Sequence, residues 1–117
     1  MNIFFRTKDV ELSQDAKDSF ARRIEGIEMF FGIHAQAYVD IEKTHPHNHG
    51  DDIYHTSIRI SEGKHNYFAD EYRESILASF DYAYQDIFRI IRNDRSKSRK
   101  LSRRLGAQLK RMFKKSK

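Results

Sequence analysis

The sequence has 117 residues, 22 Lys/Arg against 17 Asp/Glu, a net charge of +5 and no Cys. This length predicts one domain with at most a short appendage. The absence of Cys excludes a disulfide framework and Cys-ligated metal. No apolar run approaches the roughly 20 residues that span a bilayer, and the N-terminal stretch MNIFFRTKDVEL acquires charge at once, unlike a signal peptide. We therefore expect a cytoplasmic protein without a membrane partner.

The first part of the chain predicts a strand, a helix and a second strand. Ile3 and Phe5 alternate with their neighbours, as in a short strand. Ser13 is a candidate N-cap for the helix that follows, and Gly32 is a natural stop for it. The expected buried face of this helix consists of Ala16, Phe20, Ile24, Ile27 and Phe31. Alternating apolar residues over 35–41 then predict the second strand.

The next part predicts two further strands and a long helix. Residues 43–52 (KTHPHNHGDD) have the composition of a loop. Apolar alternation over 54–60, a turn at 61–64 and a strand around Tyr67 and Ala69 follow. A helix should begin between Asp70 and Ser75, with Ile76, Phe80, Tyr84, Ile87 and Ile91 on its buried face. The predicted fold is α+β, in the order β-α-β-β-β-α, with both helices on one face of a four-stranded sheet.

Charge divides the chain unevenly. Residues 89–117 carry 13 Lys/Arg and one acid, about +12, whereas the other 88 residues carry 9 Lys/Arg and 16 Asp/Glu, about −7. We therefore divide the chain into a domain over 1–94 and a basic amphipathic arm over 95–117. Such an arm indicates a polyanionic partner, with nucleic acid as the first candidate.

The arm has more than one interpretation. By composition it could be a solvated or disordered tail. Alternatively, Leu101, Leu105, Leu109 and Met112 continue the apolar stripe of the preceding helix, so the arm could extend that helix, with Gly106 as a possible break. A helical arm could bind phosphates. A helix groove in a partner protein or an anionic membrane surface is a weaker alternative.

Nothing in the sequence specifies catalysis, a cofactor or a metal. The motifs typical of phosphate-binding loops, dinucleotide folds and nucleophile elbows are absent. His45, His47 and His49 lie in the predicted loop, where a polar connection explains them better than a metal site. The Asp51-Asp52 and Glu71/Glu74 carboxylates have no recognisable partner arrangement, and the six Tyr and the paired Phe fit a core and its margins better than a stacking platform. We expect neither enzymatic activity nor a small-molecule substrate.

The order of several segments resembles one family, the ribosome hibernation-promoting factors and ribosome-associated inhibitor Y, also called sigma-54 modulation or small-subunit interface proteins. Residues 1–3 and 8–13 resemble its first strand and turn, and residues 20–28 its first helix. Residues 37–39 resemble its second strand, residues 67–69 its last strand, and residues 76–81 and 87–89 its second helix. The resemblance covers about residues 1–97 and rests on order and spacing together.

The resemblance implies a fold akin to double-stranded-RNA-binding domains. It also implies a monomer off the ribosome that binds small-subunit rRNA in the mRNA and tRNA channel and blocks translation by occlusion, without chemistry. Carried over to this sequence, its RNA-binding positions are Lys8, Lys17, Arg23, Arg89, Arg92 and Arg95. The arm adds Lys97, Arg99, Lys100, Arg103 and Arg104.

Several positions depart from the family pattern. Gly26 and Met29 stand where the first helix usually carries Lys, Ser75 and Leu77 replace residues of the second-helix signature, and the arm is longer and more basic. We hypothesise that cationic charge lost from the first helix has moved into the arm. The alternatives to a ribosome-associated factor are a general RNA-binding or RNA-chaperone module and an interaction protein that docks through its arm.

Overall fold

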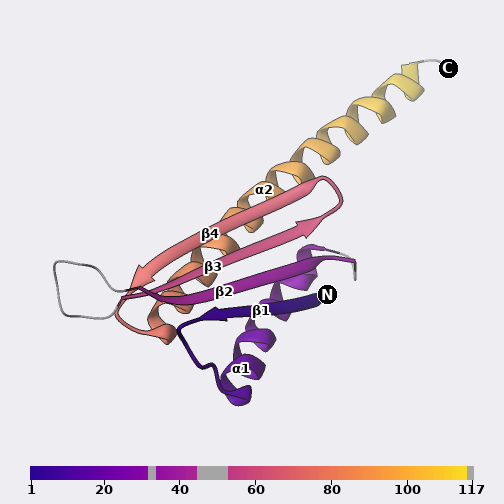
Figure 1. Ribbon diagram of the computed structural model, residues 1–117. Helices are drawn as coiled ribbons and strands as arrows, with labels where there is room; N and C mark the ends of the chain where they lie inside the picture. Colours follow the sequence, from indigo (N-terminus) through magenta and orange to yellow (C-terminus); the bar gives the residue numbers. More distant parts are fainter. Residues whose placement is uncertain (32–33, 45–52, 116–117) are drawn as a thin grey trace.

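The protein is described here by a computed structural model that covers residues 1–31, 34–44 and 53–115, with side chains up to residue 95. Its elements follow the predicted order, with a short 3-10 helix added after the first α-helix (Figure 1). They are β1 (Asn2–Lys8), α1 (Gln14–Glu25), η1 (Gly26–Phe30), β2 (Gln36–Thr44), β3 (Ile53–Glu62), β4 (His65–Arg73) and α2 (Ile76–Lys115).

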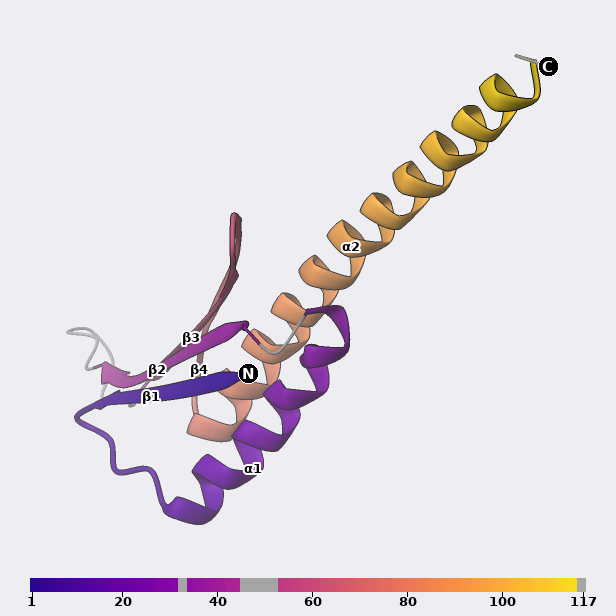
Figure 2. The same ribbon diagram turned by 90° about the vertical axis from the view of Figure 1, so that its right-hand side faces the viewer.

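The four strands form one mixed sheet in the order β1-β2-β3-β4. β1 runs parallel to β2, and the other neighbours are antiparallel. The connection between β3 and β4 is the predicted tight turn, in which Gly63 has a φ of 58°, a left-handed conformation that costs glycine little. Both α-helices lie on the same face of the sheet, as predicted, and the other face is left open (Figure 2).

Each α-helix begins at a serine whose side chain caps it. The Ser13 hydroxyl accepts a hydrogen bond from the Ala16 amide at 3.1 Å, and the Ser75 hydroxyl accepts one from the Ala78 amide at 3.0 Å. These bonds satisfy amides that have no partner inside the helix. The capped start of α2 fixes where the long helix leaves the sheet.

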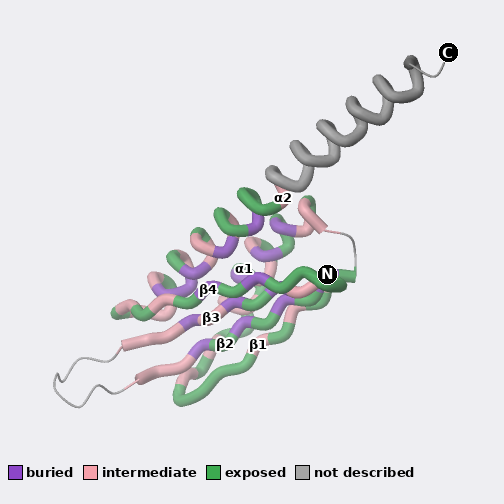
Figure 3. The backbone as a smooth tube through the Cα atoms, turned by 90° about the horizontal axis from the view of Figure 1, so that it is seen from above, coloured by how far each residue is buried: buried purple, intermediate pink, exposed green. Residues whose placement is uncertain are grey.

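The core lies between the sheet and the helices and uses the apolar positions that the sequence predicts (Figure 3). Phe20 of α1 and Phe80 of α2 stack with ring centroids 3.9 Å apart. One polar pair is fully buried there: the hydroxyls of Thr56 on β3 and Ser79 on α2 are 2.7 Å apart. Packing on one face of each strand explains why the sheet alternates so regularly between buried and exposed residues.

Three predicted boundaries are wrong. The first helix becomes 3-10 at Gly26, although Ile27 is still buried. β2 extends through Thr44, so the loop expected from residue 43 begins later, and the remainder of that loop, 45–52, lies outside the described residues, as does Gly32. β4 continues to Arg73, so the second helix begins at Ile76 rather than between Asp70 and Ser75.

The arm is the continuation of α2. The helix runs without interruption from Ile76 to Lys115, so Gly106 does not break it. The part after residue 95 projects beyond the sheet (Figure 1). The molecule is accordingly 74 Å long, with a radius of gyration of 19.3 Å, against about 13 Å for a compact domain of this length.

Candidate nucleic-acid interface

The projecting half of α2 brings the densest positive charge of the chain away from the domain. Residues 98–117 contain nine Lys/Arg and no Asp or Glu. Most of them lie on the projecting part of α2, residues 96–115, which we call the rod (Figure 1). The side chains of the predicted site residues Lys97, Arg99, Lys100, Arg103 and Arg104 lie outside the described part of the chain. Their backbone positions place them on this rod, where a long polyanion could reach them.

Arg89 and Arg92 occupy the last turns of α2 before the rod and are both exposed. Arg89 pairs with Asp86 at 3.0 Å, one turn earlier. Arg92 lies over the ring of Phe88, with its guanidinium carbon 5.9 Å from the centroid, and makes no ion pair with any side chain that the structure describes. Of the two arginines, Arg92 is therefore more readily available to bind a phosphate than Arg89.

Arg95 lies at the root of the rod and is used within the fold. Its side chain is only 21% exposed and pairs with Glu62 of β3 at 3.4 Å. The guanidinium also stacks 4.6 Å above the Phe31 ring. Arg95 thus anchors α2 to the end of the β3–β4 hairpin, and this role competes with the predicted phosphate contact.

A second anchor lies beside it on the same turn. The hydroxyl of Tyr67 on β4 donates a hydrogen bond to the carboxylate of Asp94, the one acid in residues 89–117. Burial, followed by this bond to Asp94, raises the pKa of Tyr67 to about 12. The two anchors fix the direction in which the rod leaves the domain.

Arg23 is also committed to the fold. It forms an ion pair with Asp81 of α2 and lies over two rings of that helix, 5.4 Å from the Phe80 centroid and 4.7 Å from the Tyr84 centroid. The side chain is 35% exposed, so its outer edge remains accessible. Arg23 links the two helices, and its charge is largely offset by Asp81.

Lys17 and Lys8 are not brought together with the cations of α2. Lys17 is half-buried in the first turns of α1. Lys8 ends β1 and follows Phe4 and Arg6 at intervals of two residues, so it belongs with them to the open face of the sheet. The predicted site therefore divides into the rod with Arg89 and Arg92, two structural arginines, and two separate lysines.

The open face of the sheet carries exposed aromatic side chains. Two of them, Phe4 and Tyr38, were expected in the core or its margins, and the sequence made no prediction for Phe68. Phe4 is 49% exposed, Tyr38 is 38% exposed and Phe68 is 51% exposed. Each alternates with core residues on its own strand, as Tyr38 does between Ala37 and Val39. That alternation was the signal that could have identified them, because neighbouring strand residues point to opposite faces.

The structure offers no assembled metal site in the part that it describes. No group of three or more potential metal ligands occurs there, and His45, His47 and His49 lie outside it. Glu71 does find partners: a hydrogen bond with Asp86 raises its pKa, and Arg73 pairs with it at 3.1 Å. No described helix is long and apolar enough to cross a membrane.

The fold is shared with solved structures of other proteins. The N-terminal domain of Thermus thermophilus Protein Y matches with a TM-score of 0.67 and 13% identity, over 80% of this chain and 98% of that one. A ribosomal subunit interface protein from Coxiella burnetii matches with a TM-score of 0.64 and 6% identity, over 82% of this chain and 99% of that one. No family model and no curated protein matches the sequence. At these identities the likeness confirms the predicted fold.

Proposed function

We propose that this protein is a ribosome-associated factor that binds small-subunit rRNA in the mRNA and tRNA channel and inhibits translation by occlusion. The observation that carries the proposal is the fold. Two proteins of the same architecture, one of them described as a ribosomal subunit interface protein, match it over at least four-fifths of this chain. The proposed setting is the cytoplasm, with the protein monomeric away from the ribosome.

The charge distribution supports an RNA target for this fold. Phosphate contacts supply affinity without reading base sequence, so a dense row of cations suits an extended rRNA surface. The rod offers that density, and Arg89 and Arg92 continue it onto the domain. The helix surface of the domain is less basic, because Arg23 is offset by Asp81. Binding through the rod is consistent with the hypothesis that cationic charge moved from the first helix into the arm.

Occlusion is tested by competition on purified small subunits. The intact protein should displace labelled mRNA or tRNA with saturable, one-to-one stoichiometry. A variant with Gln at Lys97, Arg99, Lys100, Arg103 and Arg104 should displace the labelled mRNA or tRNA much more weakly. Gln is chosen because its helix propensity is similar to that of Lys and Arg. A control with Gln at three exposed cations of the domain, Arg6, Arg22 and Lys64, should behave as the intact protein does. Binding without displacement would refute occlusion.

The second candidate is a general RNA-binding or RNA-chaperone module, which the basic rod would also suit. It predicts that the protein binds any duplex RNA as tightly as it binds ribosomes. Parallel titrations of ribosomes and an unrelated duplex at one fixed salt concentration separate the two functions, since phosphate-driven affinities depend steeply on salt.

A further inference from the structure

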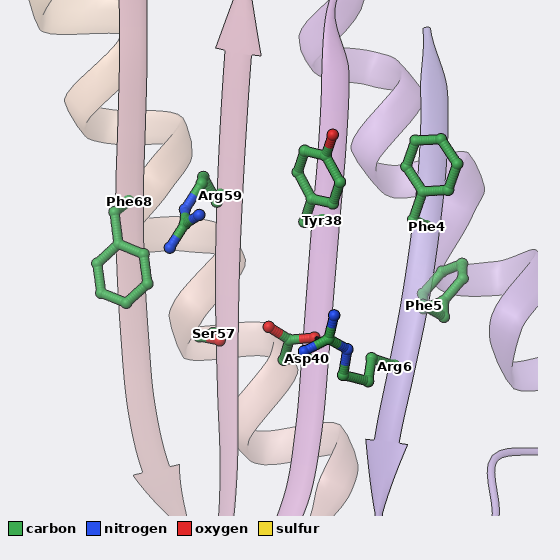
Figure 4. A pocket seen from close by; sticks show the side chains of 8 residues that line it. All are labelled: Phe4, Phe5, Arg6, Tyr38, Asp40, Ser57, Arg59 and Phe68. Carbon is green, nitrogen blue, oxygen red and sulfur yellow. Dashed lines mark ion pairs between the residues drawn. The ribbon is translucent and has the colours of Figure 1, made fainter.

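A row of three aromatic rings and one arginine crosses the open face of the sheet. The strand register aligns Phe4 with Tyr38, Tyr38 with Arg59, and Arg59 with Phe68. The row therefore has one member on each of the four strands, and it spans roughly 14 Å at the usual separation of strands. It lies on the face of the sheet opposite to the helices (Figure 4).

The rings of this row present their faces to solvent. In the close view, Phe4, Tyr38 and Phe68 are seen as open hexagons above their strands, with the helices behind the sheet (Figure 4). The Phe4 and Tyr38 rings are nearly parallel, at 19°, with centroids 5.3 Å apart. The row lines a hollow of about 530 Å³. Flat rings with free faces can stack on other planar groups.

Polar groups on both sides of the row suit a nucleotide. Arg59 is exposed and makes no ion pair among the described side chains, so its guanidinium can stack or meet a phosphate. The adjacent row of the register is uncharged and can hydrogen-bond base edges: Asn2, Gln36, Ser61 and Asn66. The Tyr38 hydroxyl donates to the side-chain oxygen of Gln36 at 2.6 Å, which leaves the amide nitrogen of Gln36 free to donate.

The acids on this face already have partners. Asp40 lies 3.8 Å from Arg6. His55 contacts both Glu42, at 3.2 Å, and Asp70, at 2.9 Å. The acidic groups therefore lie to one side of the aromatic row and are engaged by basic residues, while the other side is uncharged.

We propose that the row Phe4–Tyr38–Arg59–Phe68 is a binding site for unpaired bases of single-stranded nucleic acid. The rings stack on about two or three bases, Arg59 contacts the phosphate backbone between them, and the neighbouring amides bind base edges. A duplex cannot use this site, because its bases are already stacked on one another. The site is separate from the basic rod and does not rest on the function proposed above.

The test compares single-stranded with duplex RNA. Fluorescence polarisation at fixed salt measures binding of the full chain to a short oligouridylate and to an unrelated RNA duplex. Phe68→Ala should weaken oligouridylate binding by about 5- to 150-fold, the cost of losing one stacked ring, and leave duplex binding unchanged. Phe68→Tyr should preserve both, because it keeps the ring.

A matched control removes an exposed ring elsewhere. Tyr82 is 47% exposed on α2, under the guanidinium of Arg73, and Tyr82→Ala should leave oligouridylate binding unchanged. Circular dichroism confirms that each variant is folded. Equal oligouridylate affinity of Phe68→Ala and the unchanged protein would overturn the proposal. So would an equal loss of duplex binding, or a dimer in sedimentation that Phe68→Ala dissociates, since this face would then bind a second copy.

Discussion

The hydroxyls of Thr56 on β3 and Ser79 on α2 form a buried pair. Removing one or the other hydroxyl should lower the unfolding free energy by different amounts. Ser79 donates its hydroxyl hydrogen to the Ile76 carbonyl at 2.9 Å. It therefore accepts a hydrogen bond from Thr56 at 2.7 Å. Both residues are 0% exposed, so water cannot replace either partner.

The two single variants differ in what they leave behind. Thr56→Val conserves shape and leaves Ser79 with its donor satisfied, so it should cost about 1 kcal/mol of unfolding free energy. Ser79→Ala leaves the Thr56 hydroxyl buried without an acceptor and should cost about 2 kcal/mol, within a range of 1–3. The double variant has no unsatisfied hydroxyl and should cost about 1 kcal/mol, far less than the two singles together.

Urea denaturation of the four proteins measures this cycle. Midpoints with a common slope give the differences in unfolding free energy. Additive costs, or a Thr56→Val variant less stable than Ser79→Ala, would refute the assignment of donor and acceptor. The same contact seats α2 on the sheet and so supports the position of the rod.

Three further variants test the caps, the core and the root of the rod. Ser13→Ala should lower the unfolding free energy by about 1 kcal/mol through loss of the N-cap, measured by urea denaturation. Phe80→Ala should cost about 3–5 kcal/mol, seen as a greatly lowered melting temperature, because the ring is fully buried. Tyr67 has its pKa raised to about 12 in the folded protein against 10 unfolded. The contribution of Tyr67 to the unfolding free energy is complete below pH 10. It is lost as the pH rises through 12, because the tyrosine of the unfolded state ionises first. Stability should therefore fall less over that interval in Tyr67→Phe than in the unchanged protein; identical profiles would contradict the assignment.

Most of the fold could be predicted because the helices cover only one face of the sheet. Val39 and Ile41 alternate with exposed residues, and Phe80 and Ile87 recur at helical spacing, so each element shows its own period. The candidate N-cap Ser13 then marked where α1 begins. The end of β4 was missed because its last residues, including Glu71 and Tyr72, are polar or exposed. Their strand conformation depends on pairing with β3 and on the His55–Tyr72 stack, 4.1 Å between centroids.

The candidate site was less predictable than the fold. The sequence located the basic arm and its helical period, since both are local properties. It could not show that Arg23 and Arg95 are held by Asp81 and Glu62, because each pair joins segments far apart in the chain. Nor could it show that Phe4, Tyr38 and Phe68 fall into one row, because that depends on the register of four strands.

The most direct test of the proposed function is co-sedimentation with purified ribosomes in sucrose gradients at several salt concentrations. The full chain is compared with a chain that ends at residue 97 and so lacks nine Lys/Arg. We expect the full chain to sediment with ribosomes at low salt and to dissociate as salt rises. The shortened chain should bind much more weakly and with a flatter salt dependence, since each phosphate contact contributes about 0.7–0.9 to the slope of log K against log salt. Absence of the full chain from the ribosome fractions, or unchanged binding of the shortened chain, would contradict it.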